Sequence, residues 1–86
     1  LVLEAITGRP IDDEVAGRLL RPHRLGETMP SDARTLPGLS QGYAGAQNPF
    51  GGRDAMLDAD GTMVVNPQFE GAGGGYAATA ADAARW

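Results

Sequence analysis

The sequence contains no cysteine and no lysine, and its only histidine is His23. Without cysteine the chain has neither a disulfide framework nor a thiolate metal site, so the redox compartment is undetermined. A single histidine forms neither a metal cluster nor a catalytic triad without partners from elsewhere. We interpret His23 as a partly exposed residue at the end of a helix.

Basic side chains are fewer than acidic ones, 7 against 11, which gives a formal net charge of −4. A nucleic-acid or anionic-membrane partner needs a basic face that displaces counterions from phosphate, so the composition argues against both. No apolar stretch approaches the roughly 20 residues that span a bilayer. Leu1–Leu3 is too short for the apolar core of a signal peptide.

The supply of large apolar side chains is small, because 13 of the 86 residues are glycine and 6 are proline. A domain of this size buries only part of its surface, and its stability is marginal. The chain also begins inside an expected helix and stops in the first turns of another. We therefore expect an internal fragment of a larger protein that is largely unfolded in isolation.

The patterns of apolar and turn residues predict an α+β chain of helices and loops with one short β-hairpin. Gly8 is expected to stop the first helix, and Asp12 to cap the second. The apolar face of that second helix comprises Ile11, Val15, Ala16, Leu19 and Leu20. The expected segments are a helix tail over 1–8, a helix over 12–21, a loop over 22–54, a hairpin over 55–65, a glycine-rich segment over 69–77 and a helix start over 79–86.

The long loop has few apolar residues that could hold it to a core. We expect Leu36 and Leu39 to do so. Tyr43 and Phe50 have two interpretations: they anchor the loop, which we favour, or they form a stacked pair for a ligand.

Asp60-Gly61 supplies the positive backbone angles of a hairpin turn between two short strands. Asp58 and Asp60 also suggest a calcium loop. That loop requires a glutamate at its twelfth position, where this chain has Phe69, so we prefer a plain turn.

Near the end of the chain, a glycine run opens onto a helix start. Thr79 and Asp82 have the spacing of a capping box, in which Thr79 caps the helix and the Asp82 side chain reaches back to the N–H of Thr79. The glycines suit a sharp bend or a close approach to another backbone or a ligand, and a flexible connector is the alternative.

Three stretches together resemble the serine beta-lactamase family, which includes class C beta-lactamases, D-alanyl-D-alanine peptidases and related esterases. Residues 66–86, NPQFEGAGGGYAATAADAARW, resemble its "NP-aromatic, glycine-rich, STAxDLARW" block. Residues 3–10, LEAITGRP, resemble the "LexxTGxP" that follows the family's Tyr-x-Asn motif. Leu20-Arg21-Pro22 with Leu25 and Thr28 resembles "hxPLGLxxT", although His23-Arg24 stands where the family has Leu-Gly.

The resemblance implies acyl transfer through a serine ester, followed by hydrolysis, with no metal or organic cofactor. The family's nucleophile lies in a Ser-x-x-Lys motif, which a chain without lysine cannot contain. Ser31 and Ser40 are the only serines, and both lie in loop sequence. The family's Tyr-x-Asn motif and Lys/His-Thr-Gly strand are expected before and after this chain, so no catalytic residue is predicted within it.

By the same resemblance, Phe69 is a side-chain contact for the substrate, and Gly73, Gly74 and Gly75 form one wall of its cleft. Phe69 could equally be an apolar plug between the hairpin and the final helix. Class C enzymes often place a tyrosine at the position of Gly74, whereas this chain has Tyr76. That departure favours a peptidase or esterase over a beta-lactamase.

The acidic residues Asp12, Asp13 and Glu14 are interpreted as solvated cap and dipole residues at a helix start. The family resemblance implies a secreted, periplasmic or envelope-associated protein that acts on a small-molecule or peptide substrate. The alternative is a non-catalytic binding or scaffold module with the same fold. The sequence gives no oligomeric state.

Overall fold

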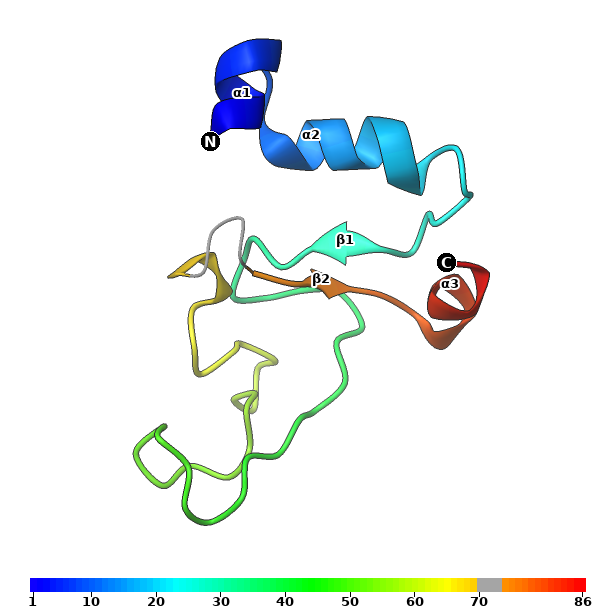
Figure 1. Cartoon of the computed structure of the whole chain (residues 1–86). Coiled ribbons are helices and arrows are strands. Elements are labelled where there is room, and N and C mark those ends of the chain that lie inside the picture. The colour runs from blue at the N-terminus through cyan, green and yellow to red at the C-terminus, as the bar shows by residue number, and fades with distance from the viewer. Residues whose placement is uncertain (70–73) are drawn as a thin grey trace. The chain divides into compact units, whose positions relative to one another are not determined.

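The structure is a computed structural model that describes residues 1–69 and 74–86. The chain divides into two compact units (Figure 1): unit 1 comprises Leu1–Pro30 and Tyr76–Trp86, and unit 2 comprises Ser31–Gly75. Unit 1 contains helices and a small two-stranded antiparallel sheet, so the predicted α+β class is confirmed. In the described parts of the chain, no helix has the length and apolar character needed to cross a membrane.

The first helix of unit 1, α1 (Val2–Thr7), ends at a glycine, as predicted. Gly8 has φ 67° and lies in the left-handed region, and its N–H donates to the Glu4 carbonyl oxygen at 2.8 Å. No atom lies within 4 Å of the position that a Cβ would occupy there. The backbone angle, rather than lack of space, therefore requires glycine.

The second helix consists of α2 (Ile11–Val15) and a π-helical turn, η1 (Ala16–Leu20). The prediction that Asp12 caps it was wrong: the N-cap is Pro10, without a side-chain cap. The fixed φ of proline, here −56°, suits the residue that leads into a helix, and the Asp12 carboxylate is engaged elsewhere. The helix then widens ahead of Pro22, whose ring would clash with a regular α-helical backbone.

The wide turn changes which apolar residues are buried. Leu20 is buried, whereas Leu19 is 41% exposed although the four-residue spacing places it on the buried face. The N–H of Arg21 donates to the carbonyl of Ala16, five residues earlier. A five-residue step widens the turn and shifts the residues around the helix axis, so a repeat of four no longer follows one face.

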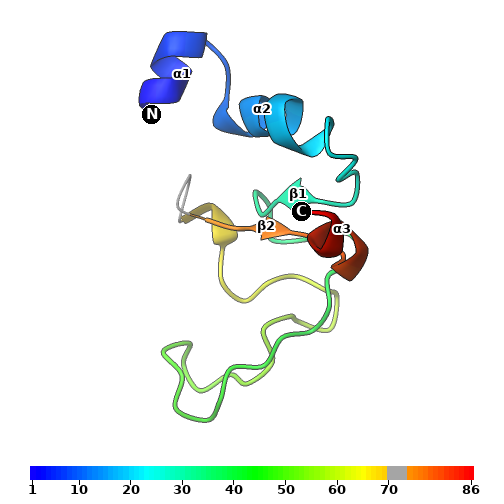
Figure 2. The ribbon, with the colours of Figure 1, turned by 45° about the vertical axis from the view of Figure 1, so that its right-hand side comes forward.

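Strands β1 (Met29–Pro30) and β2 (Tyr76–Ala77) pair antiparallel, with Met29 opposite Ala77. Figure 2 shows them side by side, with β2 leading into α3 (Ala80–Arg85). The sequence did not predict this pair. Strands of two residues carry no readable alternation, and their partners are distant in the sequence.

Helix α3 begins at Thr79, whose side-chain oxygen accepts the N–H of Asp82 at 3.2 Å, so the predicted cap is confirmed. The reciprocal half of the capping box was wrong. The Asp82 carboxylate turns toward the segment before β1, where it accepts hydrogen bonds from Glu27 and Thr28. The Asp82 carboxylate thus bonds to donors that are distant in the sequence instead of to the N–H of Thr79.

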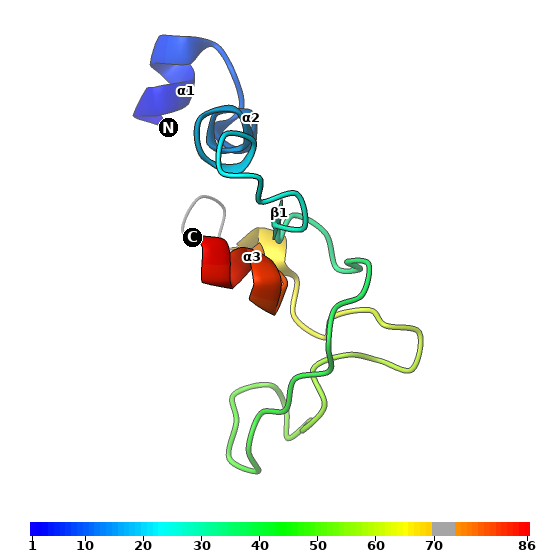
Figure 3. The same ribbon diagram turned by 90° about the vertical axis from the view of Figure 1, so that its right-hand side faces the viewer.

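Unit 2 consists largely of turns and irregular chain, drawn in green and yellow in Figure 3. Leu36 is buried, as predicted. Tyr43 is 74% exposed, so the prediction that it anchors the loop was wrong. Phe50 is 38% exposed.

The expected hairpin is a tight turn with one bridge between Leu57 and Met63, and no longer strands form there. Gly61 has φ 81°, and the N–H of Thr62 donates to Asp60 Oδ1 at 3.2 Å, which lowers the pKa of that carboxyl group. These contacts confirm the turn at Asp60-Gly61.

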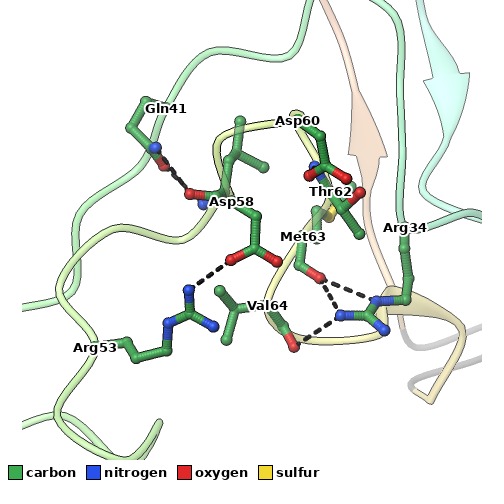
Figure 4. Close-up of polar contacts among 9 residues, drawn as sticks. Arg34, Gln41, Arg53, Asp58, Asp60, Thr62, Met63 and Val64 are labelled. Carbon is green, nitrogen blue, oxygen red and sulfur yellow. Dashed lines mark hydrogen bonds and ion pairs between the residues drawn. The ribbon is translucent and has the colours of Figure 1, made fainter.

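Polar side chains hold the turns of unit 2 together (Figure 4). The Arg34 guanidinium donates to the carbonyls of Met63 and Val64, and Arg53 pairs with Asp58. The Gln41 amide donates to the Leu57 carbonyl and accepts the Leu57 N–H. Hydrogen bonds of this kind stabilise turns that have few buried apolar side chains.

Candidate functional site

Phe69, the predicted substrate contact, lies in a helical turn over 67–69, and its side chain is 92% exposed. Its N–H donates to the Asn66 carbonyl, and Asn66 Oδ1 accepts the N–H of Gln68 at 3.1 Å. The Asn66 contacts fix the backbone of the turn. The interpretation of Phe69 as an apolar plug between the hairpin and the final helix stays a prediction, because these two segments belong to different units.

Gly74 and Gly75 are the two members of the predicted glycine wall that the structure describes, and Gly73 lies outside the described residues. The Gly75 carbonyl accepts the N–H of Ser31 at 3.1 Å. A Cβ at Gly75 would meet no atom within 4 Å, and the φ of Gly75 is outside the left-handed region. Neither packing nor backbone conformation within the described chain requires a glycine there.

The side chain of Asp82 in unit 1 is 1% exposed, and its carboxylate accepts hydrogen bonds from several donors. Asp82 Oδ2 accepts the Glu27 N–H at 2.8 Å and the Thr28 hydroxyl at 2.9 Å. Asp82 Oδ1 pairs with Arg85 Nη1 at 2.9 Å. Both carboxylate oxygens are thus occupied by donors, which suits a buried structural charge and not a general base.

Thr79 closes the hydrogen-bond network around Asp82. Its Oγ1 donates to Glu27 Oε2 at 3.1 Å while accepting the Asp82 N–H. The cap of α3 and the segment before β1 are therefore held by the same group of side chains. No buried side-chain nitrogen or oxygen in the described residues lacks a partner.

Tyr76, in β2, lies against the first turn of α2. Its hydroxyl donates to Asp12 Oδ1 at 2.7 Å. Partial burial raises the pKa of Tyr76 to about 12, and the hydrogen bond to Asp12 and its negative charge add to this effect. The pair explains why Asp12 does not cap its own helix.

We expect the raised pKa of Tyr76 to make the fold sensitive to alkaline pH. Below pH 10 the phenol is neutral in both the folded and the unfolded chain, so its contribution is fully present. Between pH 10 and about 12 the unfolded chain ionises first, and the free energy of unfolding falls as the pH rises. Urea unfolding of the intact protein at several alkaline pH values measures this fall.

Tyr76→Phe should flatten that alkaline slope, whereas Tyr43→Phe, at an exposed tyrosine, should leave it as in the unmodified protein. Equal slopes for the unmodified protein and Tyr76→Phe would contradict the assignment.

Glu14 is 4% exposed, so the prediction that this side chain is solvated was wrong. It pairs with Arg9 Nη1 at 3.1 Å through one oxygen and with Arg18 Nε at 2.7 Å through the other. Both arginines are more than half exposed and lie over the carboxylate. Arg18 follows Glu14 by four residues, a spacing that could have revealed this pair from the sequence.

Glu14→Gln should lower the free energy of unfolding by about 1–3 kcal/mol, because a buried group loses two charged partners. Chemical denaturation of the intact protein measures the change. Asp13→Asn is the matched control, since Asp13 is exposed on the same helix. Similar changes in the free energy of unfolding for the two variants would show that the buried ion pairs of Glu14 do not contribute to stability.

An apolar groove of about 480 Å³ lies within unit 1 between α2–η1 and α3. Leu19, Leu25, Tyr76 and Trp86 are among its lining residues, and Asp82 is its charged one. Since the carboxylate of Asp82 is fully engaged, the groove offers apolar surface and no free acid or base.

The described residues contain no assembled catalytic centre. Within residues 1–69 and 74–86, the side-chain hydroxyls that donate hydrogen bonds belong to threonine and tyrosine, and neither Ser31 nor Ser40 is among them. In the same residues, no group of three or more His, Cys, Asp or Glu could hold a metal ion. The sequence singled out Thr28 and Asp82 as parts of motifs but did not reveal that they meet.

Comparison with protein-family models, with curated proteins and with solved structures gives no match.

Proposed function

We propose that this chain is part of a serine hydrolase resembling beta-lactamases and D-alanyl-D-alanine peptidases. The reaction is acyl transfer through a serine ester followed by hydrolysis, without a metal or organic cofactor. The chain supplies one wall of the substrate cleft within a beta-lactamase-like fold, and the nucleophile lies in another part of the protein. A secreted or envelope-associated location and a small-molecule or peptide substrate belong to the same proposal.

One observation carries the proposal: two of the three stretches that resemble the family are joined by a hydrogen bond between their motif residues. Thr28 ends one stretch and Asp82 lies in another, and they are hydrogen-bonded at 2.9 Å. In the third stretch, Gly8 has the left-handed conformation and Glu4 Oε1 accepts the Ile11 N–H at 3.0 Å. Motif residues thus hold the backbone of unit 1, as residues shared within a fold family would.

The exposed Phe69 and the unconstrained Gly75 support the role of a cleft wall. An aromatic side chain that is 92% exposed has its contact surface available to a substrate. A glycine that the described chain does not itself require leaves room for a ligand to approach the backbone. Tyr76 is held by Asp12, which favours a peptidase or esterase over a class C beta-lactamase.

The test uses the intact protein that contains this chain, with a fluorophosphonate probe and p-nitrophenyl acetate as substrate. We expect one covalent adduct on a serine outside these 86 residues, located by peptide mapping, and loss of both adduct and turnover when that serine is replaced by alanine. Phe69→Ala should retain the adduct and lower kcat/KM by roughly tenfold. Phe50→Ala is the matched control, expected near the unmodified value.

Absence of both an adduct and esterase activity would overturn the proposal and favour the non-catalytic scaffold. That alternative has one observation on its side: within the described residues, neither Ser31 nor Ser40 has its hydroxyl hydrogen-bonded to an acid or a base, whereas the threonine hydroxyls that donate to carboxylates belong to the network around Asp82.

A further inference from the structure

Most arginines of this chain have a partner in the described residues. Arg9 and Arg18 pair with Glu14, Arg53 with Asp58 and Arg85 with Asp82, and Arg34 donates to carbonyl oxygens. Arg21 and Arg24 differ: neither side chain has a carboxylate or hydrogen-bond partner within residues 1–69 and 74–86. In a chain with a net charge of −4, Arg21 and Arg24 are thus two neighbouring cations without a partner in the described part of the chain.

Arg21 and Arg24 both line one cavity of unit 1, with a volume of about 510 Å³. Its other lining residues include Ala16, Leu20 and Leu25, and Leu25 is only 2% exposed. The cavity therefore combines two guanidinium groups with an apolar floor. This combination suits an anion that carries an apolar group, because guanidinium forms paired hydrogen bonds to carboxylate and phosphate oxygens.

Arg24 has φ 59° and is the one residue other than glycine in the described chain with a positive φ. A side chain in this conformation costs backbone energy, and glycine would adopt it freely. The resembling motif has glycine at this position. The left-handed residue ends the helix: the Arg24 N–H donates to the Arg21 carbonyl at 3.1 Å, and the Leu25 N–H donates to the Leu20 carbonyl at 2.9 Å. Glycine is the usual residue at this position of a helix end.

The Arg21 side chain lies along the helix, with Nη2 at 3.0 Å from the position that a Cβ at Gly17 would occupy. The negative end of the helix dipole favours a cation at Arg21.

We propose that Arg21 and Arg24 bind the carboxylate or phosphate group of a small ligand whose apolar part lies on Ala16, Leu20 and Leu25. The inference does not depend on the serine-ester chemistry, since it rests on other residues.

Isothermal titration calorimetry of the intact protein with octanoate, octyl phosphate and uncharged octanol tests the proposal. We expect at least one of the two anions to bind at least tenfold more tightly than octanol, and the comparison between them identifies the preferred head group. Arg24→Gly should weaken binding of the preferred anion about tenfold or more without lowering Tm, because glycine accepts φ 59°. Arg21→Gln should also weaken binding.

Arg53→Gln, which removes the same charge in unit 2, is the matched control and should leave the affinity within twofold. Equal binding of octanol and the anions, no binding of either anion, or an unchanged affinity in a folded Arg24→Gly variant would each overturn the proposal. An equal loss in Arg53→Gln would also overturn it, because the effect would then follow net charge.

Discussion

Replacing Asp82 with alanine is expected to lower the free energy of unfolding by about 3–5 kcal/mol, the range found when one partner of a buried ion pair is removed. The carboxylate is 1% exposed and accepts from Glu27, Thr28 and Arg85. Its removal leaves the Glu27 N–H and the Thr28 hydroxyl without an acceptor in a part-buried site, and the cost of unpaired donors adds to the lost charge pair.

Urea denaturation of the intact protein measures this change. Asp13→Ala is the control, because Asp13 is exposed and near a helix start, and its loss should cost about 1 kcal/mol or less. The loss in the free energy of unfolding for Asp82→Asn should lie between those for Asp82→Ala and Asp13→Ala, since the amide keeps one acceptor oxygen. Equal stability of Asp82→Ala and Asp13→Ala would refute the structural role of the carboxylate.

Leu25→Ala should produce the second large effect, a loss of about 2–5 kcal/mol. Leu25 is 2% exposed and contributes to the walls of two cavities in unit 1, so its truncation removes apolar contacts and enlarges existing space. Few other apolar side chains in the described residues are buried to this degree. A small core depends more strongly on each of its members.

Leu19→Ala is the matched control for Leu25→Ala. Leu19 is 41% exposed on the preceding helix, and its truncation should cost about 1 kcal/mol. Thermal and urea unfolding of the intact protein distinguish the two variants. A smaller effect at Leu25 than at Leu19 would show that the buried leucine does not stabilise unit 1.

The thin core seen in the structure explains why polar contacts have so large a part in the expected stability. Buried side chains in unit 1 include Glu14 and Asp82 beside Leu20 and Leu25. Each buried carboxylate has arginine partners, so its charge is compensated where it is removed from water. Substitutions at these carboxylates should therefore lower stability by amounts whose ranges overlap those expected for the apolar core.

The candidate site was predictable to different degrees. The resemblance predicted Phe69 and the glycine segment as a site. The structure adds that Phe69 is exposed and that neither packing nor backbone conformation in the described chain requires a glycine at position 75. The pair of Arg21 and Arg24 was not predicted as a site. Its significance depends on a shared cavity, which a sequence does not show.

The sequence by itself determined the features that depend on a few neighbouring residues. Gly8 ends α1, Thr79 caps α3, and Asp60-Gly61 forms a turn, because backbone sterics and short-range hydrogen bonds decide these positions. Only the tertiary structure decided the pairing of β1 with β2 and the partners of Asp82 and Asp12. These contacts join residues that are distant in the chain. A carboxylate at a helix start can bond to a neighbouring N–H or to a distant donor, and the distant hydrogen bond is favoured where burial makes it stronger.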